Sequence, residues 1–177
     1  FSLEYPLSPE AKFPDQLAAA ISAYYWLEQI VGVENIIIGG DSAGGTLILS
    51  LYRQLLQDSV TNVRLTLPKS LIIISPWLDI SLSHTPPDIV EHLSSTYDFL
   101  PLKMLESWRD NVTPHGTNPR DPAISPFFDL SPIKLPLDGM LLVYGSTEVF
   151  APVIDDWIKA IRKQPDARAN LKVNSKN

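Results

Sequence analysis

The chain has 177 residues, of which 45% are hydrophobic and 19% charged, so it can bury the core of one domain. Its formal net charge of −6 argues against a nucleic-acid partner, because phosphate backbones require a basic surface. The absence of Cys excludes disulfides, a thiol nucleophile and thiolate metal sites, and no apolar run approaches the ~20 residues of a transmembrane segment.

Apolar periodicity predicts strands and helices in alternation along the chain. Residues 1–5 are expected to belong to a strand. A helix is predicted over residues 14–31, where Pro suits the first helical position and apolar side chains share one face. Further strands are predicted at residues 35–39, 71–74 and 140–144, and further helices around residues 47–56 and 152–163. The alternation predicts an α/β fold with a parallel sheet, whose β-branched strands are expected to be buried on both faces.

One connection interrupts the alternation. Residues 76–138 are rich in Pro, Ser and Asp, with a single helix predicted near residues 101–110. Long connections in compact domains commonly form lids or binding segments, so this one is interpreted as a cap-like insertion over the carboxyl ends of the strands. Residues 168–177 are polar and are predicted to end without a strand. We expect residues 1–177 to form one partial domain.

The most specific local motif is Gly40-Asp41-Ser42-Ala43-Gly44, which fits G-x-S-x-G between a predicted strand and a predicted helix. In such a nucleophile elbow the serine adopts a strained backbone conformation, and small residues on either side avoid collisions. The backbone N–H of Ala43 could then donate to an oxyanion, while Gly45 gives clearance for the helix. The alternative is a phosphate-binding or merely packed turn, although no Lys follows as in a Walker loop.

Five ordered segments carry a wider resemblance: LEYPLSPE with FP (3–10 and 13–14), GDSAGG (40–45), SPWLD (75–79), DPAISP (121–126) and GSTEVF (145–150). They resemble the hormone-sensitive-lipase-like branch of the α/β-hydrolase superfamily and indicate a fungal member. The resemblance implies a partial α/β-hydrolase fold with a mostly parallel sheet, flanking helices and a cap-like insertion.

The same resemblance implies a carboxylic ester hydrolase that needs no metal or organic cofactor. Ser42 would attack the ester carbonyl, a histidine would act as base, and Glu148 matches the position of the acid that orients the histidine. Asp79 is the second candidate for the acid, because it also follows a sheet strand. Asp155 and Asp156 are expected to be solvated carboxylates on a helix face.

Two parts of the family pattern are missing from these 177 residues. The His-Gly-Gly segment that supplies further oxyanion donors would precede residue 1. The catalytic histidine would follow the 152–163 helix, whereas His84, His92 and His115 all lie in the cap-like insertion, in the wrong chain order for the base. We therefore expect the chain to be a piece of a longer hydrolase, with exposed sheet edges and no activity by itself.

The predicted function is cleavage of short acyl esters of a hydrophobic alcohol, a small-molecule substrate. An apolar pocket of limited size is suggested by the aromatic residues Trp77, Phe99, Trp108, Phe127 and Phe128, which could equally be core. Two alternatives remain. The chain could be a non-catalytic small-ligand receptor, as plant gibberellin receptors resemble this family and lack its histidine, or an inactive truncated relative.

Overall fold

The computed structural model describes residues 1–61, 67–129, 131, 134–136, 138–164 and 171–176. Its sheet contains four parallel strands in the order β1-β2-β3-β4, namely β1 (Ile37–Asp41), β2 (Ser70–Ile74), β3 (Met140–Gly145) and β4 (Leu171–Lys176). The α/β class and the parallel sheet are thus confirmed. Because the strands are parallel, all their carboxyl ends lie at one edge of the sheet.

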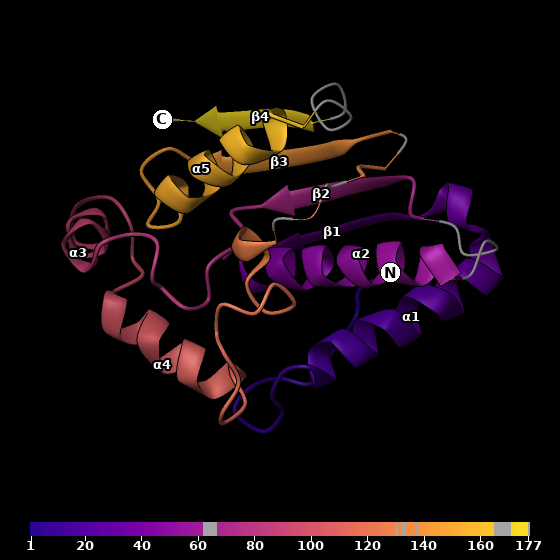
Figure 1. Cartoon of the computed structure of the whole chain (residues 1–177), viewed down its shortest axis with the longest axis horizontal. Coiled ribbons are helices and arrows are strands. Elements are labelled where there is room, and N and C mark those ends of the chain that lie inside the picture. Colours follow the sequence, from indigo (N-terminus) through magenta and orange to yellow (C-terminus); the bar gives the residue numbers. More distant parts are fainter. Residues whose placement is uncertain (62–66, 130, 132–133, 137, 165–170, 177) are drawn as a thin grey trace.

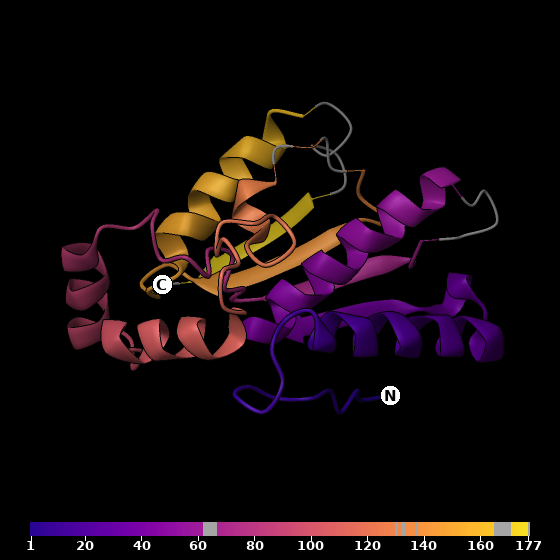
Figure 2. The same ribbon diagram turned by 60° about the horizontal axis from the view of Figure 1, so that its bottom comes forward.

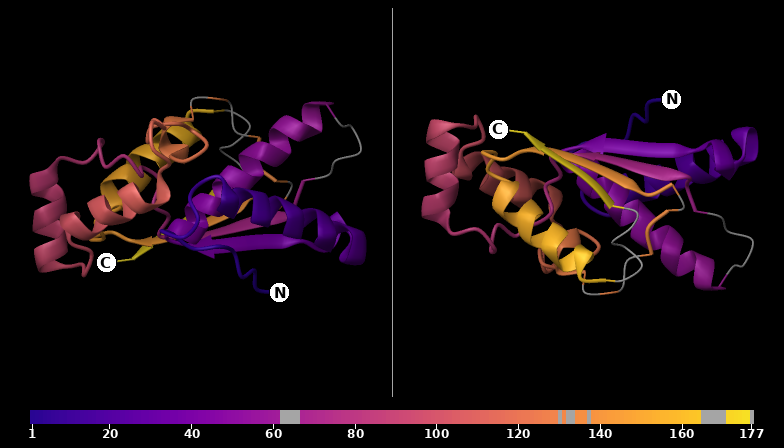
Figure 3. Two further views of the ribbon diagram at one scale, coloured as in Figure 1. Left: turned by 90° about the horizontal axis from the view of Figure 1, so that it is seen from below. Right: turned by 90° about the horizontal axis from the view of Figure 1, so that it is seen from above.

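The described helices are α1 (Asp15–Val31), α2 (Ala43–Thr61), α3 (Pro87–Thr96), α4 (Leu102–Val112) and α5 (Ala151–Arg162), with short 3-10 turns η1 (Val33–Asn35) and η2 (Pro126–Phe128). Figure 3 shows α2 and α5 on the same side of the sheet. The main core lies there, where Leu71, Ile73 and Leu142 of the strands are fully buried against both helices. Helix α1 packs on α2 around Tyr24 and Leu55.

The prediction that the strands are buried on both faces is wrong. Side chains on β1 and β2 alternate between faces, and Ile37, Ile72 and Ile74 on the second face are 55%, 37% and 44% exposed. Parallel sheets are normally covered on both faces, which is why continuous β-branched runs suggest full burial. Here the described residues bury only the face toward α2 and α5.

The predicted strand at residues 1–5 is also absent. Residues 1–7 have no regular secondary structure, and Figure 2 shows them running apart from the four strands. A groove of about 760 Å³ lies between this segment and the edge strand β1, with Phe1 and Leu3 on one wall and Ile37 and Gly39 on the other. The segment therefore has no strand to pair with among the described residues.

The structure contains one strand and one helix that the sequence did not predict. Residues 168–177 were expected to end without a strand, but β4 pairs with β3 from Leu171 to Lys176. The connection 76–138 contains α3 as well as the predicted α4. In Figure 1 both helices lie beyond the carboxyl ends of the strands, where the cap-like insertion was expected. None of the described helices is long and apolar enough to cross a bilayer.

Candidate active site

Ser42 occupies the sharp turn between β1 and α2. Its φ of 50° is left-handed, so the strained conformation expected of the elbow is present. The turn is tied to the next strand on both sides. The Ser42 N–H donates to the Ile74 carbonyl at 2.9 Å, and the Ser42 carbonyl accepts from the N–H of Trp77 at 3.2 Å. The Thr46 hydroxyl also donates to the Trp77 carbonyl at 2.6 Å. These bonds hold the serine at the carboxyl edge of the sheet.

Crowding in the elbow is concentrated at Gly40. A Cβ placed on Gly40 would lie 2.4 Å from the carbonyl oxygen of Gly44, which is backbone and cannot move aside. A Cβ on Gly45 would meet Pro76 at 3.1 Å. A Cβ on Gly44 would meet nothing within 4 Å, so the expectation that Gly44 is required for clearance is wrong. The tight approach involves the backbone of Gly44, not its missing side chain.

Gly40→Ala and Gly44→Ala form a matched pair that tests this asymmetry. We expect Gly40→Ala to destabilise the fold by about 3 kcal/mol through overpacking, which lowers Tm by roughly 10 °C for a domain of this size. Gly44→Ala should leave Tm unchanged or raise it, since Ala is the better helix former. Thermal unfolding followed by circular dichroism measures both. Equal losses in the two variants would contradict the assignment of the close contact to Gly40.

The N–H of Ala43 is available at the start of α2. Ala43 is the first residue of the helix, where a backbone N–H has no acceptor within its own helix. It follows Ser42 directly and is exposed, at the end of the helix that favours negative charge. This position suits an oxyanion donor. Asp41 is the last residue of β1, and it is exposed to solvent.

Glu148 lies in the turn between β3 and α5, two strands from Ser42. Its Oε1 accepts hydrogen bonds from the Gly145 N–H at 2.8 Å and from the Ser75 hydroxyl at 2.9 Å. The side chain is half-buried. The next residue, Val149, donates its N–H to Asp98 at 2.9 Å, so the turn is also anchored to the connection between α3 and α4. The carboxylate is therefore fixed at the same edge of the sheet as Ser42.

Asp79, the second candidate for the acid, has both carboxylate oxygens engaged locally. Oδ2 accepts the N–H groups of Ser83 and His84, each at 2.9 Å, and Oδ1 accepts the Ser81 hydroxyl. The residue is 2% exposed. A buried carboxylate with these partners stabilises the turn at residues 79–84, and both of its oxygens are engaged in that turn.

Asp155 and Asp156 lie on a solvent-accessible face of α5, as expected, and each also contacts neighbouring side chains. Asp155 accepts a hydrogen bond from the Tyr144 hydroxyl. Burial of the hydroxyl, and to a smaller extent this bond, raise the pKa of Tyr144 to about 12. Asp156 accepts from Lys159 at 2.7 Å and contacts the His84 ring at 3.0 Å. Hydrogen bonds from Lys159 and then His84 lower the pKa of Asp156. Both carboxylates thus serve contacts of α5.

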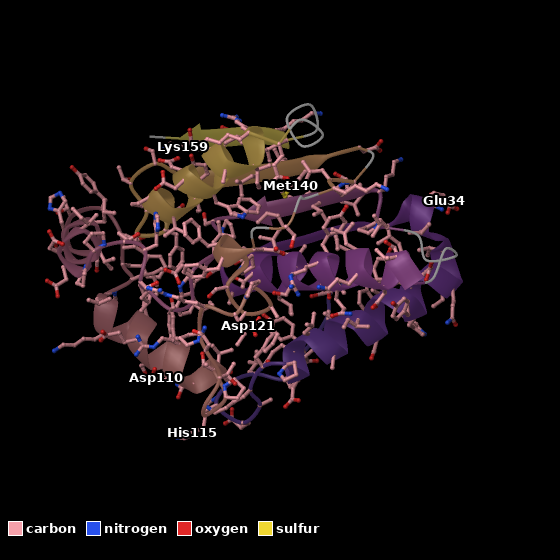
Figure 4. All side chains as sticks on the ribbon, in the orientation of Figure 1. Glu34, Asp110, His115, Asp121, Met140 and Lys159 are labelled. Carbon is pink, nitrogen blue, oxygen red and sulfur yellow. The ribbon has the colours of Figure 1, made fainter. Side chains whose placement is uncertain are left out.

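The structure brings none of the three histidines to Ser42. The His84 ring lies against Asp156 and, at 4.3 Å between centroids, against Phe127. His92 is exposed beside Tyr97. His115 is exposed too, and Figure 4 places it at the lower rim of the molecule. Among the described residues, no histidine ring hydrogen-bonds to Ser42.

A cavity of about 380 Å³ opens beside Ser42. Its walls are mostly apolar and come from the N-terminal segment, α2, α4 and the loop after β2; they include Leu7, Phe13, Leu47, Trp77, Ile80 and Trp108. The rings of Trp77 and Trp108 meet edge to face at 6.4 Å, and Trp77 stacks on Phe150 at 5.8 Å. Of the five aromatic residues expected around a pocket, only these two tryptophans line the cavity.

The other three lie outside the cavity. Phe99 is 84% exposed, Phe127 packs on His84, and Phe128 lies under the Arg120 guanidinium at 5.5 Å. Within the described ranges, no group of three or more His, Asp or Glu side chains is placed to hold a metal ion.

Sequence reasoning missed one residue of the site, Ser75. It follows β2 directly and bonds to Glu148, and its φ of 43° is left-handed like that of Ser42. The sequence did offer a signal for Ser75, because it directly follows a predicted strand and therefore lies at the same edge of the sheet as the elbow.

Comparisons with known proteins agree with this fold. A family model described as the alpha/beta hydrolase fold matches residues 1–169. An esterase of Acinetobacter venetianus is 31% identical over 179 aligned positions, which cover 98% of this chain and 52% of that protein. An acetyl-hydrolase of Streptomyces hygroscopicus is 35% identical over 153 positions, covering 84% of this chain and 46% of that protein.

A solved structure has a similar fold. A crystal structure described as a hormone-sensitive lipase from a metagenome library has a TM-score of 0.75 and 28% sequence identity, covering 98% of this chain and 53% of that chain. The chain thus spans about half the length of the relatives it matches.

Proposed function

This chain belongs to the α/β hydrolase fold family, and from that membership we propose that it carries the nucleophile and the acid of a serine-dependent carboxylic ester hydrolase. The single observation that carries the proposal is Ser42, in a left-handed turn at the start of α2 and at the wall of an apolar cavity. Relatives named esterase and acetyl-hydrolase support the reaction class. The proposal is tested by measuring the cleavage of p-nitrophenyl acetate, which should disappear when Ser42 is replaced.

The mechanism follows from these positions. The Ser42 Oγ forms a bond to the ester carbonyl carbon while a base takes its proton. Negative charge then develops on the carbonyl oxygen, where the Ala43 N–H donates a hydrogen bond. The alcohol leaves with the proton returned by the base. A water molecule, activated by the same base, releases the acyl group as a carboxylic acid and restores Ser42.

Glu148 has the role of the acid in this proposal. Its Oε1 is held by two donors, so Oε2 remains to accept a hydrogen bond from a protonated base and to stabilise its positive charge. Asp79 is the weaker candidate, because both of its oxygens already accept hydrogen bonds within residues 79–84.

The base is a histidine that residues 1–177 do not supply. His84 is engaged with Asp156, while His92 and His115 are exposed away from the elbow. The relatives are about twice as long as the aligned chain, which supports a base, and further oxyanion donors, contributed by a segment outside these residues.

The cavity favours short acyl chains. We expect kcat/KM for p-nitrophenyl acetate or butyrate to exceed that for the twelve-carbon ester by at least about tenfold, because a long acyl chain does not fit between the apolar walls of a 380 Å³ cavity. The relative named acetyl-hydrolase supports this preference. Trp108→Ala should reduce the ratio by opening one wall. Phe99→Ala is the control, since this exposed ring lies outside the cavity. A preference of the unaltered protein for the long ester would contradict the proposal.

A non-catalytic small-ligand receptor is the second candidate. It is favoured by the observation that no histidine among the described residues contacts Ser42. A receptor would bind an apolar ligand in the 380 Å³ cavity without releasing a product, whereas the esterase releases acid and alcohol. Binding by calorimetry together with absent turnover in the full-length protein would favour the receptor.

A further inference from the structure

Ser75 stands between the two proposed catalytic residues and has no role in the mechanism above. We propose that Ser75 is a positioning residue, whose hydroxyl holds the Glu148 carboxylate in the orientation needed to support the base. The inference rests on the proposed function, because it assigns Glu148 as the acid. Ser75 follows β2, whereas Glu148 follows β3 and Ser42 follows β1.

The hydrogen bonds of Glu148 carry the argument. Ser75 Oγ and the Gly145 N–H both donate to the same oxygen, Oε1, at 2.9 and 2.8 Å. Among the described residues Oε2 accepts no hydrogen bond. One donor alone would leave the carboxylate free to rotate about its last bond. Two donors from different strands fix its plane, so the direction in which Oε2 presents its lone pairs is set in advance.

Because Gly145 has no side chain, the Glu148 side chain can fold back onto the end of β3. A Cβ on Gly145 would lie 3.0 Å from Glu148 Oε1 and 3.2 Å from Glu148 Cγ, tighter than most contacts of real Cβ atoms. Because a glutamate has one more rotatable bond than an aspartate, an acid of this type loses more rotamer freedom when it is held in one position. The Ser75 hydroxyl offsets that loss.

The backbone of Ser75 is itself held on both sides. Its N–H donates to the Val143 carbonyl of β3 at 2.8 Å, and two residues later the Trp77 N–H donates to the Ser42 carbonyl at 3.2 Å. Residues 75–77 therefore connect the elbow to the acid-bearing strand. The left-handed φ of 43° is strained for a residue other than glycine, and such strain tends to occur at functional sites.

That strain provides a way to separate positioning from stability. Ser75→Gly removes the hydroxyl but relieves the left-handed backbone, whereas Ser75→Ala removes the hydroxyl and keeps the strain. Ser70→Ala is the matched control, a serine-to-alanine change at the opposite end of the same strand, where the hydroxyl bonds to the Gly139 carbonyl. All three variants are made in the full-length protein.

We expect Ser75→Ala and Ser75→Gly to lower kcat about ten- to a hundredfold, with KM changed less than about twofold, because the acid is misplaced and substrate binding is not. Ser70→Ala should leave kcat unchanged. In a Glu148→Gln background the Ser75 substitutions should cause little further loss, since the two residues act through one interaction. A merely structural role would give the same fractional loss in both backgrounds, and that result would overturn the proposal, as would unchanged kcat in both Ser75 variants.

Failure of the proposed function would look different. In that case turnover would persist after Ser42→Ala, or no Ser42-dependent turnover would exist. The positioning itself is then decided by the amide proton of Gly145 in the NMR spectrum of the full-length protein, because this proton is donated to the same oxygen. Ser75→Ala should shift its resonance, and Ser70→Ala should not. An unmoved Gly145 resonance would show that the hydroxyl does not hold the carboxylate.

Discussion

Replacing Ser42 by Ala in the full-length protein should lower kcat for p-nitrophenyl acetate by about six powers of ten, to near the uncatalysed rate. The reason is that no acyl-enzyme can form without the hydroxyl, which the left-handed turn presents at the cavity wall. A fluorophosphonate probe should label Ser42, and the label should be absent from the Ala variant. Initial rates and peptide mass spectrometry measure the two effects.

Ser22→Ala is the control, an exposed serine on α1 far along the chain from the elbow. It should retain both turnover and labelling. A Ser42→Ala variant that is still labelled, at another serine, would show that the nucleophile has been misassigned.

Residues 1–177 alone provide a second comparison. They retain Ser42 and Glu148, but the described histidines do not contact Ser42, so turnover should be as low as in the Ser42→Ala variant. Ser42-dependent turnover by this chain would mean that His84, His92 or His115 reaches the serine after all.

Glu148→Gln should lower kcat by about two to four powers of ten, because a neutral amide no longer stabilises the protonated base or selects its tautomer. The amide oxygen can still accept from Ser75 and from the Gly145 N–H, so folding should be preserved. Steady-state kinetics and thermal unfolding, measured on the same samples, separate the two effects.

Asp79→Asn is the informative partner of that variant. It weakens the hydrogen bonds that the buried Asp79 carboxylate accepts from the amides of Ser83 and His84, so it should destabilise the fold by about 1–3 kcal/mol. Its kcat per folded molecule should change little. The reverse pattern, with a large kcat loss in Asp79→Asn and almost none in Glu148→Gln, would place the acid after β2 instead of β3.

The elbow was predictable from sequence because its determinants are local. The β-branched run before Gly40 and the apolar spacing after Gly44 set a strand, a turn and a helix within about twenty residues, and the strain at Ser42 follows from their connection. The family match and the solved structure confirm the α/β-hydrolase fold expected from the ordered motifs. The helices α1, α2 and α5 were found for the same reason, since each repeats its own apolar face.

Elements without an apolar signature were missed. Strand β4 contains Lys172 and Asn174 on its exposed face, so only its pairing with β3 makes it a strand. Helix α3 (Pro87–Thr96) is short, begins at a proline within the Pro- and Ser-rich connection, and buries only Val90. In both cases long-range packing decided the local conformation, and propensity did not.

The sequence by itself determined the α/β class, the turn that presents Ser42 and the absence of thiol groups from these residues, because each depends on neighbouring residues or on composition. Only the tertiary structure decided which carboxylate keeps a free oxygen. Asp79 and Glu148 both follow sheet strands, but the first is surrounded by the amides of its own turn and the second by donors from two strands. It also decided which aromatic rings face the cavity and brought Ser75 to Glu148, 73 residues later in the chain. Such contacts depend on where the strands lie in the sheet, and no window of sequence contains that information.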